Sequence, residues 1–116
     1  MVKKKIQIPI YDGELIVYQV KNWDEMKKKF HKGGGLSNIY VASTFTNYRK
    51  SGGTQYIVAF RGDPSNATIV HEAIHLTNLI FRDRGIKIST DNDEPQAYFT
   101  DWIFTQIENA LSKNEK

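Results

Sequence analysis

Two histidines and a glutamate stand close together in the run HEAIH, as His71, Glu72 and His75. On an α-helix, side chains four residues apart lie one turn above each other on the same face, so both imidazoles can reach a single ion. Glu72 can accept a proton from a water at that ion, because zinc lowers the pKa of such a water toward neutrality. The spacing predicts a zinc site with Glu72 as general base. The alternative is a pair of surface histidines bonded to backbone or acidic groups.

A catalytic zinc takes three protein ligands and keeps one position open, so the two histidines need a further ligand. The chain has no cysteine, which leaves imidazoles and carboxylates. The candidate carboxylates after the motif are Asp91, Asp93 and Glu94. Asp93 can also act as the N-cap of the last helix.

The run HEAIH, eighteen intervening residues and then EPQAY at 94–98 resemble the pattern of the gluzincins. Gluzincins are zinc metallopeptidases in which a glutamate on the next helix completes the metal site. The resemblance covers about residues 38–105, and the chain is similar in size to minimal, stand-alone members. It implies that Glu94 is the third ligand, and that a strand at 38–49 pairs through its edge with an extended substrate. Pro95 is a departure, because it biases Glu94 out of the α region. Asp93 and then Asp91 are therefore the alternative ligands.

Two residues of the last helix are further candidates for the site. Zinc-bound histidines usually donate their second ring nitrogen to a carboxylate or carbonyl. Asp101, about two helical turns after Glu94, is the predicted partner, and an exposed carboxylate is the alternative. Tyr98, one turn after Glu94, is the predicted donor to the oxyanion that develops during peptide hydrolysis, and packing in the core is the alternative. His31, beside a glycine run, is a less favoured donor.

The motif falls within a helix predicted at 67–84, with Ser65 or Asn66 as N-cap and Gly85 as its end. The helix has a broad apolar stripe beside the face that carries the histidines. Its members are Ile69, Val70, Ala73, Ile74, Thr77, Ile80 and Phe81, and Asn78 and Arg82 share the histidine face. A final helix is expected to start at Pro95 and to run to about residue 112.

The N-terminal half reads as strands and one helix. Segments 5–11 and 14–20 are rich in β-branched and aromatic residues and meet at Asp12-Gly13, a strong hairpin signal. A helix from Asn22 to about residue 30 should bury one apolar side, and a second hairpin should join 38–49 to 54–61 through the turn at 50–53. The sequence therefore predicts an α+β fold, with a small antiparallel or mixed sheet from two hairpins, an N-terminal helix, a zinc-binding helix and a C-terminal glutamate helix.

The composition, with 116 residues, 40% hydrophobic and 25% charged, suits one globular domain over 1–116. The absence of cysteine suits a reducing cytoplasm.

No run approaches the roughly 18 apolar residues that span a bilayer, so no membrane partner is expected. The net charge is +3, and the lysine clusters at 3–5 and 27–32 are more typical of a solvated face than of a nucleic-acid site.

The leading hypothesis is a zinc-dependent metallopeptidase that binds one zinc ion and takes a peptide or protein as substrate. The first alternative is a non-catalytic binding or inhibitor module in which zinc ties the two C-terminal helices together. A second alternative, suggested by the compact size, is an effector of phage or mobile-element type that uses the zincin fold to inhibit a host protein.

Overall fold

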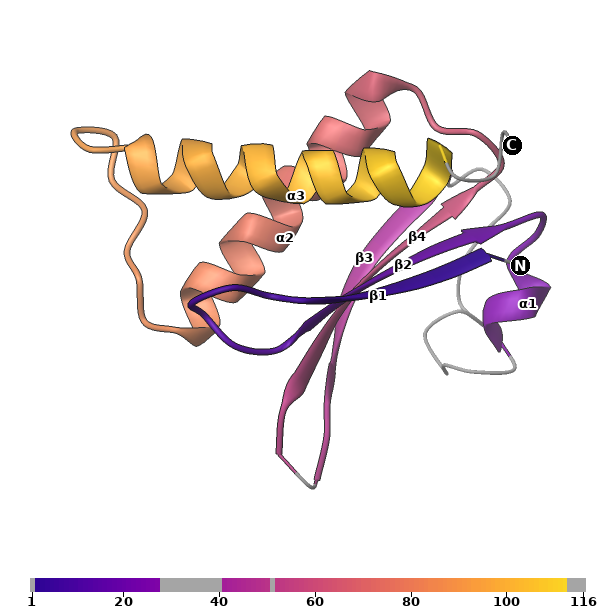
Figure 1. The fold of residues 1–116 in the computed structure, drawn as a ribbon, viewed down its shortest axis with the longest axis horizontal. Coiled ribbons are helices and arrows are strands. Elements are labelled where there is room, and N and C mark those ends of the chain that lie inside the picture. Colours follow the sequence, from indigo (N-terminus) through magenta and orange to yellow (C-terminus); the bar gives the residue numbers. More distant parts are fainter. Residues whose placement is uncertain (1, 28–40, 51, 113–116) are drawn as a thin grey trace.

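The computed structural model describes residues 2–27, 41–50 and 52–112. A four-stranded mixed sheet forms its centre, with the strand order β1-β2-β4-β3 (Figure 1). The strands are β1 (Val2–Gln7), β2 (Glu14–Val20), β3 (Ala42–Tyr48) and β4 (Thr54–Arg61). Together with three helices they give the predicted α+β fold, and the mixed sheet is built from the two predicted hairpins.

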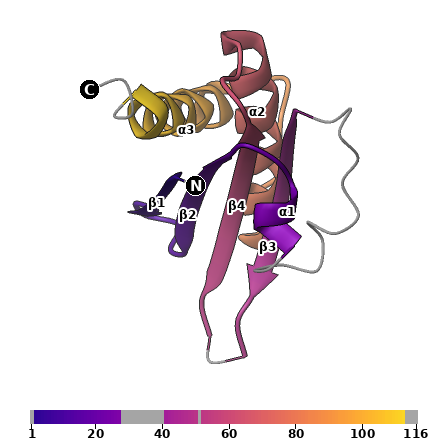
Figure 2. The same cartoon turned by 90° about the vertical axis from the view of Figure 1, so that its right-hand side faces the viewer.

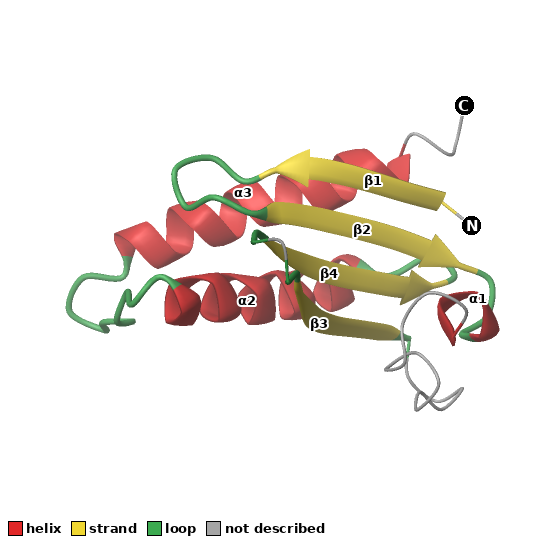
Figure 3. Ribbon diagram, turned by 90° about the horizontal axis from the view of Figure 1, so that it is seen from below, coloured by secondary structure: helices red, strands yellow, loops and turns green. Residues whose placement is uncertain are grey.

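Each hairpin is antiparallel, and the two hairpins join through a parallel pairing of β2 with β4. This arrangement leaves β1 and β3 at the two edges of the sheet (Figure 3). Among the described residues β3 pairs with β4 alone and lies at an edge of the sheet. The predicted edge strand is therefore present over Ala42–Tyr48, while residues 38–40 lie outside the described residues.

Two long helices cover one face of the sheet (Figures 1 and 2). They are α2 (Asn66–Asp83), which packs against β3 and β4, and α3 (Glu94–Ser112), which packs against α2, β1 and β2. Alternate residues of β2 and β4 point into this core, as expected from the twofold period of a strand. Its buried members include Leu15, Val17, Tyr56, Val58, Phe60, Leu76, Ile80 and Ile103.

The opposite face of the sheet has a second core, closed by the short helix α1 (Asp24–Lys27). Trp23 and Met26 are buried there against the other alternate residues of the central strands, as the sequence predicts. The Asn22 side chain accepts a hydrogen bond from the Asp24 amide, and Glu25 accepts one from Lys21. The rest of the predicted helix, at 28–30, lies outside the described residues.

The first hairpin differs from the prediction, because β1 ends at Gln7 and the segment 8–11 is not strand. Pro9 cannot donate a ladder hydrogen bond, and the backbone turns at once, with φ of 68° at Ile10 and 64° at Asp12. The Tyr11 ring packs edge-on against Phe99. The connection is therefore a loop packed onto the helical layer, longer than the two-residue turn that Asp12-Gly13 suggested.

The helical layer agrees closely with the sequence. The Ser65 side chain caps α2 by accepting from the Thr68 amide at 3.2 Å, which decides between the two predicted caps. The helix α3 begins at Glu94, one residue before Pro95. Within the described ranges, no helix is both long and apolar enough to cross a membrane.

Candidate metal centre

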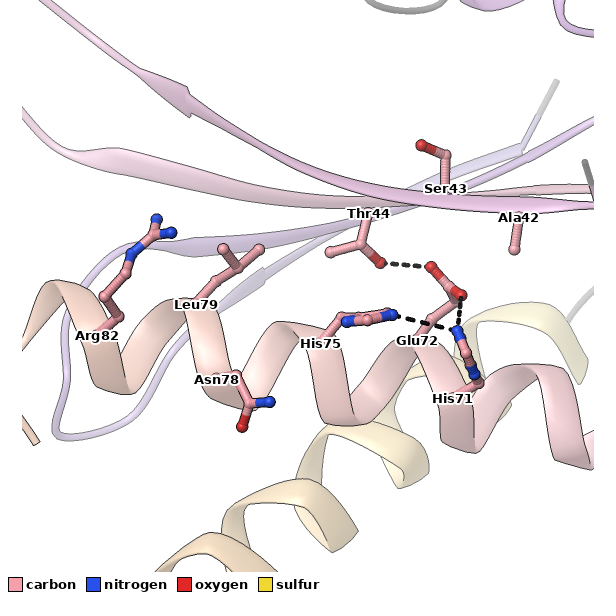
Figure 4. Close-up of a pocket in the computed structure, with 9 residues that line it drawn as sticks. All are labelled: Ala42, Ser43, Thr44, His71, Glu72, His75, Asn78, Leu79 and Arg82. Carbon is pink, nitrogen blue, oxygen red and sulfur yellow. Dashed lines mark hydrogen bonds and ion pairs between the residues drawn. The ribbon is translucent and has the colours of Figure 1, made fainter. Parts of the chain in front are cut away.

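His71 and His75 lie one turn apart on α2, and their rings converge. Their Nε2 atoms are 3.1 Å apart (Figure 4). Two nitrogens bonded to one tetrahedral zinc at about 2.0–2.1 Å would lie roughly 3.3 Å apart. Both side chains are exposed, with 68% of the His71 side chain open to solvent. The separation is that of a hydrogen bond between the two rings and also suits two nitrogens that bind one ion, and the pair can be reached from solvent.

Glu72 adds a carboxylate to the same point. Its Oε2 atom lies 3.8 Å from His71 Nε2, and one ligand atom from each of the three residues lies within 4.8 Å of the others. Among the described residues, this is the one group of three or more such side chains with that geometry. The His–Glu–His group could hold a metal ion.

A threonine of β3 fixes the Glu72 side chain. The Thr44 hydroxyl donates a 2.8 Å hydrogen bond to Glu72 Oε1 (Figure 4). Glu72 is only 7% exposed, whereas the flanking histidines are open to solvent. One carboxylate oxygen is thus engaged by the sheet, and the other is turned toward His71.

These side chains lie in a groove of about 530 Å³ between α2 and the N-terminal half of β3. The helix supplies residues from three successive turns, so the groove continues beyond the histidines toward the end of α2 (Figure 4). The lining consists of Ala42, Ser43, Thr44, His71, Glu72, His75, Asn78, Leu79 and Arg82.

A polar cluster surrounds Arg82, which lines the far end of this groove. Tyr56, fully buried, donates a 2.7 Å hydrogen bond to Asp83, and Tyr48 donates to the same carboxylate at 3.2 Å. Burial, followed by the hydrogen bond to Asp83, raises the pKa of Tyr56, so its hydroxyl stays protonated. Arg82 contacts both Tyr48 and Asp83, and its hydrogen bond to Tyr48 is the main reason that its pKa is raised.

The three predicted carboxylate ligands lie at the start of α3 and just before it. Asp91, Asp93 and Glu94 are all exposed, and the structure does not bring any of them into the His–Glu–His group. The backbone carbonyl of Asp93 accepts from the Ala97 amide, which puts Asp93 at the cap position considered from sequence. The start of α3 is nevertheless tied to the groove, because the Gln96 amide donates to the Asn78 side chain at 3.3 Å.

The two other predicted residues of α3 do not line the groove. Tyr98 is 70% exposed and borders a separate hollow of about 220 Å³, formed with the loop at 9–11 and with Pro95, Phe99 and Trp102. Tyr98 is thus absent from the lining of the groove that contains the histidines. Asp101 is exposed on α3 and is absent from the groove lining among the described residues. His31 lies outside the described residues.

The predicted apolar stripe of α2 is wrong at two positions. Val70 and Ile74 are 43% and 44% exposed, whereas Glu72 and Leu76 are buried. The helix is rotated so that Glu72 faces β3, where Thr44 satisfies its carboxylate. Sequence reasoning missed Thr44, because the partner of a buried carboxylate on a neighbouring element leaves no periodic signal.

A comparison of the chain with family models, curated proteins and solved structures finds no match. The functional argument therefore rests on the residues of the groove.

Proposed function

We propose that this protein is a zinc-dependent peptidase of gluzincin type. The observation that supports the proposal most is the meeting of His71 Nε2 and His75 Nε2, 3.1 Å apart, beside Glu72 Oε2. The imidazole donors and their spacing suit zinc, which favours nitrogen ligands and tetrahedral geometry. The groove also lies beside β3, which is an edge strand of the sheet among the described residues.

Each residue of the site has a separate role in the proposed hydrolysis. When bound, zinc would act as a Lewis acid that polarises the scissile carbonyl and lowers the pKa of the attacking water. His71 and His75 hold the metal. Glu72 takes the proton of the attacking water and passes it to the leaving amine. The outer edge of β3 would bind the peptide in an extended form through main-chain hydrogen bonds.

Glu94 is our proposed third ligand. It lies two residues before Gln96, which contacts Asn78 in the groove, and Asn78 lies about one turn after His75. Coordination by Glu94 would require this end of α3 to bring the carboxylate to the histidine pair when metal binds. Asp93 and Asp91 are the alternatives, and zinc affinity measured in Glu94→Gln, Asp93→Asn and Asp91→Asn ranks the three.

The central experiment compares the wild-type protein with Glu72→Gln. Both are purified without chelator, their zinc content is measured, and both are incubated with a mixture of peptides whose products are read by mass spectrometry. We expect one zinc per chain in each protein, and a loss of turnover of at least about 100-fold in the variant. A Glu72→Gln protein as active as wild type would remove Glu72 as the base.

The same variant tests the non-catalytic alternative, which one observation favours. Glu72 Oε2 lies close enough to the histidine nitrogens to be a ligand itself. A zinc held by His71, Glu72 and His75 would leave no base beside it, and the protein would be a zinc-stabilised binding or inhibitor module. In that case Glu72→Gln loses zinc, and the wild-type protein hydrolyses no peptide.

A further inference from the structure

The groove extends well past the residues that would hold the metal. Arg82 lines its far end, seven residues after His75 on the same helix. At about 1.5 Å per residue, this separation is roughly 10 Å along α2. An extended peptide advances about 3.3 Å per residue, so the same distance corresponds to about three substrate residues.

The Arg82 guanidinium is held in place but not covered. Its Nη2 atom donates to the Tyr48 hydroxyl at 3.2 Å and lies 3.4 Å from Asp83. Asp83 in turn is fixed by the buried Tyr56. The side chain of Arg82 is still 61% exposed, against 15% for Asp83. The described contacts of Arg82 use its Nε and Nη2 atoms. The guanidinium has five N–H donors, so others remain for a ligand.

Arg82 brings a positive charge to this end of the groove, and the carboxylate that it contacts, Asp83, does not line the groove. Apart from the histidines, Glu72 and Arg82 are the ionisable side chains of the lining. Glu72 lies at the other end, where Thr44 engages it. A guanidinium matches a carboxylate in shape and charge, and such charge-assisted pairs are among the stronger hydrogen bonds.

We infer that the Arg82 end of the groove is a carboxylate-binding subsite, which selects substrates with an acidic group about three residues from the scissile bond. This inference rests on the proposed peptidase function. The carboxylate can belong to an aspartate or glutamate side chain or to a free C-terminus, since both present the same group to the guanidinium.

The test begins with peptides that the wild-type protein cleaves in the mixture. Each is remade as a pair with Glu or Gln at the third residue from the scissile bond, with both termini blocked. A third peptide has Gln and a free C-terminal carboxylate at that distance. We expect kcat/KM for the Glu peptide, or for the free-carboxylate peptide, to exceed that of the blocked Gln peptide by about tenfold or more. The favoured peptide identifies the source of the carboxylate.

Two variants assign that preference to Arg82. Arg82→Gln should bring the ratio of kcat/KM for the favoured carboxylate peptide to kcat/KM for the blocked Gln peptide close to one. Arg82→Lys should restore part of that preference. Lys87→Gln removes one positive charge from an exposed position that does not line the groove, and it should keep the wild-type ratio. A peptidase with no acidic preference, or one whose preference survives in Arg82→Gln, would overturn the inference and leave the proposed function standing.

A binding measurement decides the inference if no peptide is cleaved. One peptide of the mixture is then made in three forms, with an internal Glu and blocked termini, with Gln in its place and blocked termini, and with that Gln and a free C-terminal carboxylate. Each form is labelled with a fluorophore and titrated with Glu72→Gln protein in the presence of zinc, with and without the Arg82→Gln change. Tighter binding of a carboxylate peptide that disappears with Arg82→Gln supports the subsite, although the peptidase proposal has then failed. Equal binding of the three peptides overturns the subsite.

Discussion

At the scale of single residues, the hydrogen bond from Thr44 decides how Glu72 is presented. A carboxylate has two equivalent oxygens and can rotate about its last bond. The hydroxyl of Thr44 holds Oε1 at 2.8 Å, and Oε2 is left 3.8 Å from His71 Nε2. Because the side chain is nearly buried, this contact also supplies a partner that water would otherwise provide. Thr44 is thus a positioning residue for the proposed base.

Replacing Thr44 with valine should separate positioning from folding. Valine keeps the shape but removes the donor, so Glu72 loses its fixed orientation. We expect kcat to fall about tenfold while zinc content is retained, and stability to fall by about 1 kcal/mol. Peptide hydrolysis and urea unfolding measure the two effects. Thr44→Ser should restore most of the activity, and Thr46→Val, on the same strand but outside the groove lining, is the matched control. Full activity in Thr44→Val would exclude this role.

The histidine pair and its glutamate could be predicted from sequence because they act within one helix, where spacing alone sets geometry. The convergence of the two Nε2 atoms on α2 agrees with that prediction. Thr44 comes from a strand 28 residues earlier, so its contact depends on how helix and sheet pack. Tyr98 was placed by helical spacing from Glu94, but spacing along α3 does not say which face of α3 meets α2.

At the scale of elements, α2 is the platform of the site, and its first turn needs a cap. The first amides of a helix have no intrahelical partner. Ser65 supplies one for Thr68, and His71 follows within the next turn. The sequence left the choice between Ser65 and Asn66 open, since both residue types cap helices well.

Removing the cap should weaken the protein without changing the groove directly. Ser65→Ala is expected to reduce the free energy of unfolding by about 1 kcal/mol, because the Thr68 amide loses its acceptor. Asn66→Ala, at the exposed first residue of the helix, should change stability by less than about 0.5 kcal/mol. Chemical denaturation of both variants gives the comparison. Equal losses would mean that Asn66 shares the capping role.

Elements whose signals are local were predicted well. The strand β4 was expected at 54–61 and is found there, and α2 was expected at 67–84 and is found at Asn66–Asp83. The first strand is predicted at 5–11 but is found at Val2–Gln7. The apolar pattern continues through Pro9 and Tyr11, whereas the backbone leaves the sheet at Pro9. The parallel pairing of β2 with β4 joins segments far apart in sequence, and no local pattern fixes it.

At the scale of the whole molecule, both hydrophobic cores are complete without the metal site. One lies between the sheet and the two long helices, and the other lies under α1. Among the described residues, no buried side-chain nitrogen or oxygen lacks a hydrogen-bond partner. The His–Glu–His group lies outside both cores, in an open groove between α2 and β3. The residues that would hold a metal are therefore not members of either core.

This arrangement predicts that chelation removes zinc but leaves the chain folded. A structural zinc supplies much of the folding free energy of a small domain, and its removal unfolds the protein. Here zinc should add only its binding energy, about 2.7 kcal/mol at a free concentration 100 times its Kd, which raises Tm on the order of 10 °C. Circular dichroism with EDTA should therefore show an unchanged spectrum and a lower but still cooperative transition. Loss of the folded spectrum on chelation would instead favour the zinc-stabilised binding module, because both cores would then need the metal to hold α2 in place.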